Sequence, residues 1–203
     1  MVKASGLSNG LAQLTALAPG GYALGLHIRF ASAQIMVNTY DPKWVEVYAS
    51  RGYMLCDPLI SWGFGAEGCV RWSALTHPDP HQVLAQAAEF GLRFGVAVSC
   101  GPTTSRSIGG FARADREFTD AEMTEIADLV ASLHHSTEPP SRLPPTQIEA
   151  LRLVAQGLRY SEAAHRLGIS ESALKARLRN AREGLLCRTT PEAIQRALEN
   201  KLL

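Results

Sequence analysis

Hydrophobic and polar positions change period along the chain. Residues 22–30 alternate roughly, and two short apolar runs follow at residues 95–99 and 108–112. A period of two is typical of strands in a sheet. Residues 119–134 instead place apolar side chains on one helical face: Met123, Ile126, Ala127, Val130 and Leu133. The pattern predicts a sheet covered by helices, of the α/β or α+β class.

Three Asp-Pro steps lie between these runs, at residues 41–42, 57–58 and 79–80. Aspartate is a good N-cap, and proline suits the first position of a helix, so each step can open one. The steps predict helices over residues 42–52 and 80–91, both of which reach a glycine.

The C-terminal part has a helical period throughout. We expect helices over residues 146–156, 161–167 and 170–182, and a fourth that opens at residues 190–192. Residues 136–145 contain four prolines and read as an extended linker. The chain therefore divides into a domain at residues 1–135, the linker at 136–145, and a small all-α domain at 146–203.

The second and third of these helices have the features of a helix-turn-helix. Ala164 is small where two helices cross, Gly168 tolerates the dihedral angles of a tight turn, and Ser170 can cap the next helix. That helix carries Lys175, Arg179 and Arg182 at positions i, i+4 and i+7, with Arg177 between them. Such a helix suits the DNA major groove, although a helical hairpin with a solvated basic face would have the same pattern.

Charge is distributed unevenly along a chain of net charge +1. Residues 1–140 hold 9 Lys and Arg against 13 Asp and Glu, whereas residues 141–203 hold 11 against 6. Only the second part is suited to a polyanion. No apolar run is long enough to span a membrane, and no secretory signal precedes the first domain, so we expect a cytoplasmic protein. The four separated cysteines predict reduced thiols without a metal site.

With these residues in view, the C-terminal domain resembles the LuxR-type helix-turn-helix. The resemblance runs from Leu143 through residues 167–170 to Leu178. It implies a four-helix domain that binds double-stranded DNA as a dimer, with Lys175 and Arg179 at base edges. This sequence departs from the family at four positions: Gln147, Leu174, Arg177 and Gly184. Gly184 should weaken the end of the recognition helix.

The N-terminal part resembles the autoinducer-binding domain of the same quorum-sensing regulators. The family array of aromatic residues and Asp-Pro is present at Tyr40, Trp44, Tyr48, Asp57-Pro58 and Trp72. The resemblance implies an α+β, α/β/α sandwich-like domain that binds an N-acyl homoserine lactone. The array begins closer to Met1 than is usual, which predicts that an N-terminal helix is missing or reduced.

The resemblance also implies a role for each residue of the array. The Trp44 indole donates to the lactone carbonyl, Asp57 accepts from the amide N–H, and Tyr40 donates to the amide carbonyl. Trp72 offers a face to the lactone ring and Tyr48 a wall to the acyl chain. The alternative is structural: the aromatic residues form a core stripe, and Asp57 is only an N-cap.

Other functions have less support in the sequence. No nucleophile elbow, phosphate loop or metal spacing is present, which argues against an enzyme. A closer alternative is a LuxR-like protein that acts without a ligand, or an anti-activator that heterodimerises with a sibling regulator. Failure to bind an operator alone would identify an anti-activator.

Overall fold

The computed structural model describes residues 2–29, 32–138, 143–185 and 187–203. The chain forms two compact units, residues 1–137 and 138–203. Within the described residues, no helix is both long and apolar enough to cross a membrane.

The first unit is built on a five-stranded sheet in the order β2-β1-β5-β4-β3. The strands are β1 (Tyr22–Arg29), β2 (Ser32–Asn38), β3 (Gly68–Arg71), β4 (Phe94–Cys100) and β5 (Arg106–Arg113). All four neighbouring pairs are antiparallel. The three strand runs expected from the sequence correspond to β1, β4 and β5. Strands β2 and β3, at the two edges, were not expected.

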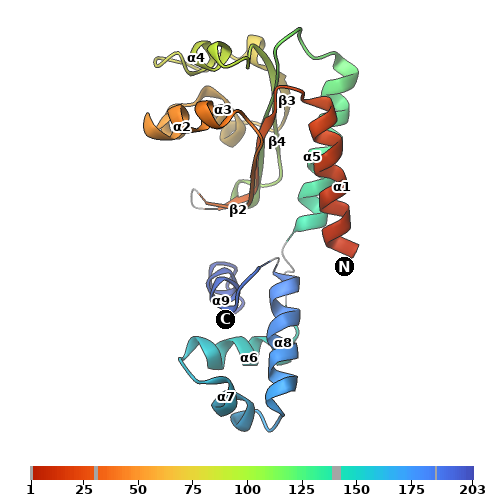
Figure 1. The fold of residues 1–203 in the computed structure, drawn as a ribbon, viewed down its shortest axis with the longest axis vertical. Coiled ribbons are helices and arrows are strands. Elements are labelled where there is room, and N and C mark those ends of the chain that lie inside the picture. Colours follow the sequence, from red (N-terminus) through yellow and green to blue (C-terminus); the bar gives the residue numbers. More distant parts are fainter. Residues whose placement is uncertain (1, 30–31, 139–142, 186) are drawn as a thin grey trace. The chain divides into compact units, whose positions relative to one another are not determined.

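Helices cover both faces of this sheet (Figure 1). On one face lie α1 (Val2–Leu17) and α5 (Asp120–Thr137). On the other lie α2 (Pro42–Ser50), α3 (Pro58–Gly65) and α4 (Val83–Glu89), with 3-10 turns η1 (Tyr53–Leu55) and η2 (Trp72–Ala74); η3 (Thr103–Ser105) precedes β5. The expected α+β, α/β/α sandwich-like architecture is therefore confirmed.

The two faces of the sheet differ in side-chain size. Toward α1 and α5 the strands present large residues that form one buried cluster: Tyr22, Leu24, Leu26, Val96, Val98 and Phe111. The alternate positions of the same strands are small: Ala23, Gly25, Gly95, Ala97, Gly110 and Ala112. Because successive side chains of a strand point to opposite faces, the second face is shallow and leaves space beneath α2, α3 and α4.

An N-terminal helix, which the sequence predicted to be missing or reduced, is present. Helix α1 is 16 residues long and packs against α5. Leu7, Leu11 and Leu14 recur at helical spacing, and Leu14 is fully buried. A Cβ on Gly10 would lie only 2.8 Å from Leu133, so the glycine permits the close approach of the two helices.

Two of the Asp-Pro steps open helices at the proline, whereas the third does not. Asp41 and Asp57 cap α2 and α3 by accepting from the second amide beyond them. Helix α4 begins three residues after Pro80, because Gln82 adopts a left-handed φ of 53°. Asp79 still caps this helix by accepting from the Val83 and Leu84 amides.

The second unit consists of α6 (Pro145–Ala155), α7 (Tyr160–Arg166), α8 (Glu171–Gly184) and α9 (Thr190–Glu199). These are the four expected helices. Ala164 and Leu174 are buried in the shared core, Gly168 has a left-handed φ of 64°, and Ser170 accepts from the Ala173 amide at 3.1 Å. The helix-turn-helix geometry expected from the sequence is present between α7 and α8.

Candidate functional site

A cavity of about 390 Å³ lies between the shallow face of the sheet and the helices α2, α3 and α4. Its floor is formed by Ala23, Gly25 and Gly110 of β1 and β5. The five residues that the sequence singled out all line it: Tyr40, Trp44, Tyr48, Asp57 and Trp72. The structure thus brings the whole array to one largely apolar cavity.

Asp57 is the acidic residue of this cavity and is 6% exposed. Its Oδ1 accepts from the Leu59 amide at 2.7 Å, and its Oδ2 accepts from the Tyr48 hydroxyl at 2.7 Å. Burial raises the pKa of the carboxyl, and these hydrogen bonds lower it in part. Asp57 is therefore both an N-cap of α3 and a cavity-lining acceptor. A role as a helix cap does not exclude a role in ligand binding.

The two tyrosines of the array direct their hydroxyls to protein acceptors. Tyr40 donates to the Gly110 carbonyl at 2.7 Å, and Tyr48 donates to Asp57. Burial, followed by the nearby Asp57 carboxylate, raises the pKa of both phenols, so they remain neutral donors. A ligand that accepts from Tyr40 has to compete with the Gly110 carbonyl.

The two tryptophans occupy different surroundings. Trp44 is part of an aromatic cluster, with ring centroids 5.8 Å from Tyr48 and 5.5 Å from Phe90. The Trp72 ring packs closely against Gly95, where a Cβ would come within 2.2 Å of the ring. The Trp72 indole N–H is buried and has no hydrogen-bond partner among the described residues. This donor would be satisfied by an acceptor brought into the cavity.

The cavity also has lining residues that the sequence argument missed. They include Ile28, Ala33 and Met36 of the β1–β2 hairpin, and Met54 of η1. The alternation of large and small residues along β1 and β5 was the available signal. It predicts a hollow face once the strands are placed in one sheet.

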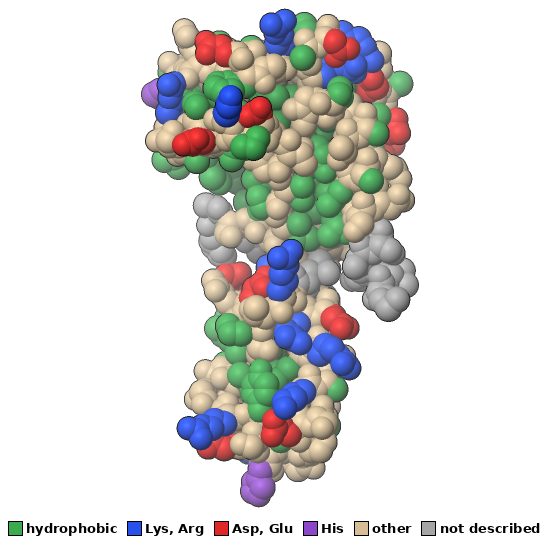
Figure 2. Space-filling model, in the orientation of Figure 1, with side chains coloured by type: hydrophobic (Ala, Val, Ile, Leu, Met, Phe, Trp, Pro, Cys, Tyr) green, Lys and Arg blue, Asp and Glu red, His purple; other side chains and the backbone are tan. Residues whose placement is uncertain are grey.

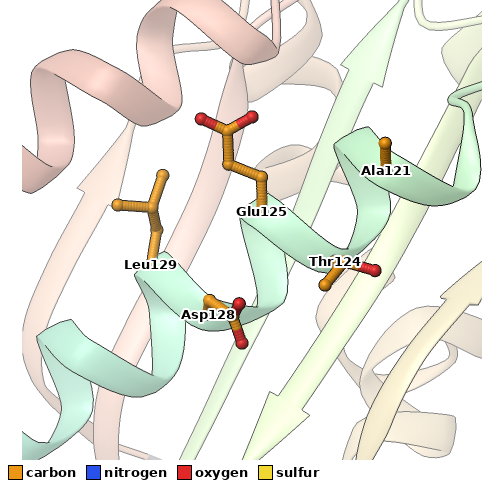
Figure 3. Close-up of a pocket in the computed structure, with 5 residues that line it drawn as sticks. All are labelled: Ala121, Thr124, Glu125, Asp128 and Leu129. Carbon is orange, nitrogen blue, oxygen red and sulfur yellow. The ribbon is translucent and has the colours of Figure 1, made fainter.

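Other parts of the described structure have less to offer a ligand. A surface depression on α5 is lined by five residues of that helix alone: Ala121, Thr124, Glu125, Asp128 and Leu129 (Figure 3). No three metal-ligating side chains are grouped among the residues placed by the structure. All four cysteines are free and partly buried.

The candidate DNA-binding face lies on α8. Lys175 is exposed and pairs with Glu171 at 2.7 Å; Arg179 is exposed, and Arg182 is half-buried. At about 100° per residue these three side chains share one side of the helix. Arg177 lies roughly 200° from Lys175 and is outside that face. Figure 2 shows Lys and Arg side chains gathered over this helix.

Comparison with known proteins identifies both units. Residues 22–138 match the family described as autoinducer binding domain, and residues 141–185 match sigma-70 region 4. Transcriptional activator protein RaiR of Rhizobium etli is 28% identical over 181 residues, which are 80% of this chain and 75% of that protein. Transcriptional activator protein TraR of Agrobacterium vitis is 24% identical over 202 residues, 90% of this chain and 85% of that protein.

A solved structure has the same fold. The structure titled SdiA in complex with octanoyl-rac-glycerol superimposes with a TM-score of 0.52 and is 18% identical. The match covers 98% of this chain and 88% of that one.

Proposed function

The chain belongs to the LuxR family of quorum-sensing transcription regulators with an autoinducer binding domain, and we propose that its ligand is an N-acyl homoserine lactone bound in the cavity of the first unit. The family makes the chain a ligand-responsive, DNA-binding transcription regulator rather than an enzyme.

The observation that carries the proposal is the unequal polarity of the cavity. Its lining holds one carboxylate, the buried Asp57, and includes Trp72, whose indole N–H is buried and has no hydrogen-bond partner among the described residues. The rest of the lining is mostly aliphatic and aromatic. A lactone amide supplies an N–H to Asp57, and the ligand's carbonyl oxygens accept from Trp44, Tyr40 or Trp72. The acyl chain then fills the apolar remainder.

Ligand binding should complete the core of the first unit. A buried polar group without a partner costs about 1–3 kcal/mol, and the cost is larger for a charge. Among the described residues the Trp72 indole N–H has no acceptor, and the Asp57 carboxyl, although it accepts from Tyr48 and Leu59, is buried in a mostly apolar cavity. The unliganded protein should therefore be marginally stable, and the lactone should raise its stability.

The second unit is proposed to place α8 in the major groove of an operator. Lys175 and Arg179 would reach base edges and Arg182 a phosphate. Arg177 points to another side of the helix and would contact a phosphate only. We assign residues 1–135 to the sensor, 136–145 to the linker and 146–203 to DNA binding, with the boundaries adjusted because α5 continues to Thr137 and α6 begins at Pro145. Residues 139–142 of the linker lie outside the described residues. A homodimer is part of the proposal, because operators for such helices are read as paired half-sites. DNA as the partner places its action in the cytoplasm.

One observation favours a second candidate, an anti-activator that heterodimerises with another LuxR-type protein. Gly184, where this sequence departs from the family, is the last residue of α8, and Lys175 pairs with Glu171 at 2.7 Å. A gel shift with operator DNA distinguishes the two candidates. A regulator of the proposed kind binds the operator by itself, and the lactone either strengthens or weakens this binding. An anti-activator does not bind the operator without a sibling regulator.

The ligand proposal is tested by calorimetric titration with N-acyl homoserine lactones. Asp57→Ala should abolish binding. Asp41→Ala is the matched control, because Asp41 caps α2 in the same way but is exposed and outside the cavity. Equal loss in both variants would point to helix capping rather than to ligand recognition.

A further inference from the structure

Two buried histidines lie face to face where β1 meets α5. The His27 and His134 rings are stacked with their centroids 4.3 Å apart, and the two residues are 1% and 5% exposed. Neither of them lines the cavity, and neither belongs to the candidate DNA-binding face. Because an unperturbed imidazole titrates near physiological pH, a buried pair of imidazoles is a candidate for a proton-sensitive element.

His27 lies at an irregular point of β1. From Gly25 to Ile28, β1 advances by three residues while its partner β5 advances by two, so β1 holds one extra residue. His27 lies in this bulge and has a left-handed φ of 53°, which is uncommon for a residue other than glycine. Its main-chain N–H donates to the Ser107 hydroxyl at 3.1 Å. Backbone of this kind persists only where the surrounding contacts hold it in place.

The ring of His27 supplies such contacts on both of its nitrogens. Its Nε2 lies 2.9 Å from the carbonyl oxygen of His134, which can only accept, so Nε2 carries the hydrogen. The other nitrogen of a neutral imidazole is an acceptor, and Nδ1 then accepts from the Ser105 hydroxyl at 2.9 Å. Nε2 also lies 3.2 Å from the hydroxyl of Thr137, the last residue of α5. His27 thereby joins β1 and the turn before β5 to the C-terminal end of α5.

The ring of His134 is arranged in the same way. Its Nδ1 lies 2.7 Å from the Ser107 hydroxyl, whose oxygen already accepts from the main-chain N–H of His27. Ser107 can therefore donate its hydrogen to Nδ1, which again suits a neutral ring. On another side the ring packs against Gly101, where a Cβ would lie 2.5 Å from it. His134 is thus confined between His27 and the loop that follows β4.

The titratable and charged neighbours of the pair come from α5 and its end, from β4, and from an ion pair that includes β5: His135, Glu138, Cys100, Arg106 and Glu67. His135 and Glu138 are exposed. Burial raises the pKa of the Cys100 thiol to about 11, so this thiol is neutral. Arg106 adds a positive charge that is paired with Glu67 at 2.7 Å. The ring partners named above are carbonyl and hydroxyl oxygens, which do not neutralise an added proton.

We propose that the His27–His134 pair is a proton-sensitive switch that holds the last turn of α5 at neutral pH and releases it in mild acid. A second proton on either ring would force the Ser105 or Ser107 hydroxyl to turn round and would place a charge in a buried stack. The first unit ends at Thr137, so the switch acts where the chain leaves this unit for the linker. The inference goes beyond the proposed function, because it does not depend on the ligand.

The direction of the effect follows from proton binding. A histidine in the unfolded chain takes up a proton near pH 6.5 (an approximate value), whereas the folded pair resists one. Below this pH the unfolded state therefore binds more protons, and stability falls as pH falls. One such histidine changes the folding equilibrium constant by up to about tenfold for each pH unit.

Urea unfolding of the full chain between about pH 5 and about pH 7.5 tests the switch. A variant carrying both His27→Asn and His134→Asn should lose this part of the pH dependence. Asparagine can still accept from the serines, tolerates a left-handed φ and does not titrate. His135→Asn is the matched control, because His135 is the exposed neighbour on the same helix, and it should behave like the wild type.

Hydrogen exchange of the wild-type protein measures the local release without any substitution. After correction for intrinsic rates, the amides of residues 133–137 should exchange about tenfold faster at about pH 5.5 than at about pH 7.5. The amides of residues 124–129, in the middle of α5, are the internal reference and should change much less.

Either measurement can overturn the switch. Parallel pH dependences of unfolding in the wild type and the double variant would show that the pair takes up no proton on unfolding. Equal acceleration of exchange at residues 133–137 and 124–129 would show that the last turn is not released, and this result decides the matter if the double variant does not fold. Binding or non-binding of a lactone bears only on the proposed function.

Discussion

The Tyr48 hydroxyl donates a 2.7 Å hydrogen bond to Oδ2 of Asp57, and this bond joins α2 to the N-terminus of α3. The same carboxylate caps α3 through the Leu59 amide. One buried acidic group therefore orders two of the helices over the cavity and also faces its interior. The ligand site and the local fold depend on the same side chain.

Removing the Tyr48 hydroxyl should affect both stability and binding. Tyr48→Phe should lower the free energy of unfolding by about 1–2 kcal/mol, because the Asp57 carboxylate loses a donor. It should also weaken lactone binding, since Asp57 is then less well oriented. Denaturant unfolding and calorimetry measure the two effects.

Tyr53→Phe is the control for this change. The Tyr53 hydroxyl also donates at 2.7 Å, to Gln86, but Tyr53 is outside the cavity lining. In this variant the free energy of unfolding should fall, and the lactone affinity should stay unchanged. Equal losses of affinity in both variants would speak against a direct role for the Tyr48–Asp57 pair.

The raised pKa of Asp57 predicts a pH dependence of stability. The pKa of the Asp57 carboxyl is higher in the folded state than its ordinary value of 3.8. The carboxyl therefore lowers the stability of the fold as pH rises from 3.8 to the folded-state pKa, and this loss persists at higher pH. Below 3.8 the group is protonated in both states and has no such effect. Asp57→Asn should thus be more stable than the unliganded wild type at neutral pH.

This advantage should shrink toward acid pH. Asparagine can still cap α3 through its Oδ1, whereas its Nδ2 would donate to the Tyr48 hydroxyl that now donates to Asp57 Oδ2. Only the part of the difference that varies with pH reports the charge. Urea unfolding of both proteins across the pH range provides the measurement. A difference that is independent of pH would mean that the Asp57 charge is not destabilising in the folded protein.

The unpartnered Trp72 indole makes a separate prediction. Trp72→Phe keeps an aromatic face against Gly95 and removes the N–H. Lactone affinity should fall by about tenfold if this N–H donates to the ligand. The free energy of unfolding of the unliganded protein should change little, because the substitution also removes a buried donor that has no partner among the described residues. Trp62→Phe is the control, because Trp62 packs in the same cluster without lining the cavity. Unchanged affinity in Trp72→Phe would leave Trp72 with a packing role.

DNA binding should depend on Arg179 more than on other cations of the second unit. Arg179→Ala should weaken operator binding by about tenfold or more and relax the preference for one base pair, as loss of a base contact does. Arg177→Ala, on another side of α8, should weaken binding less and equally for all sequences. Fluorescence anisotropy with operator and scrambled duplexes measures both. Equal and sequence-independent effects would contradict the assignment of base contacts to Arg179.

Much of this structure could be predicted from local signals. The Asp-Pro steps, the proline-rich segment and the Gly168–Ser170 turn specify their own conformations, and the helices of the second unit follow from them. Strands β2 and β3 were missed because they are short edge strands whose pairing is not visible locally. Helix α1 was missed because the family comparison outweighed its own leucine spacing.

The candidate site likewise contains some residues that the sequence could identify and others that it could not. The aromatic array and Asp57 were identifiable because their spacing is distinctive. The cavity floor and the lining residues Met36 and Met54 were not, because glycine, alanine and methionine have no chemical signature. Their importance depends on which face of the sheet they occupy and on what the neighbouring strands leave unfilled.

The most direct test of the central claim is thermal unfolding of the full chain with and without N-acyl homoserine lactones. A lactone at a hundredfold its dissociation constant should add about 2.7 kcal/mol, a rise of several degrees in melting temperature. This rise is expected for the wild type and for Asp41→Ala, and should be absent in Asp57→Ala. A protein that is stable alone and melts at the same temperature with every lactone would contradict the claim that the cavity is a lactone site.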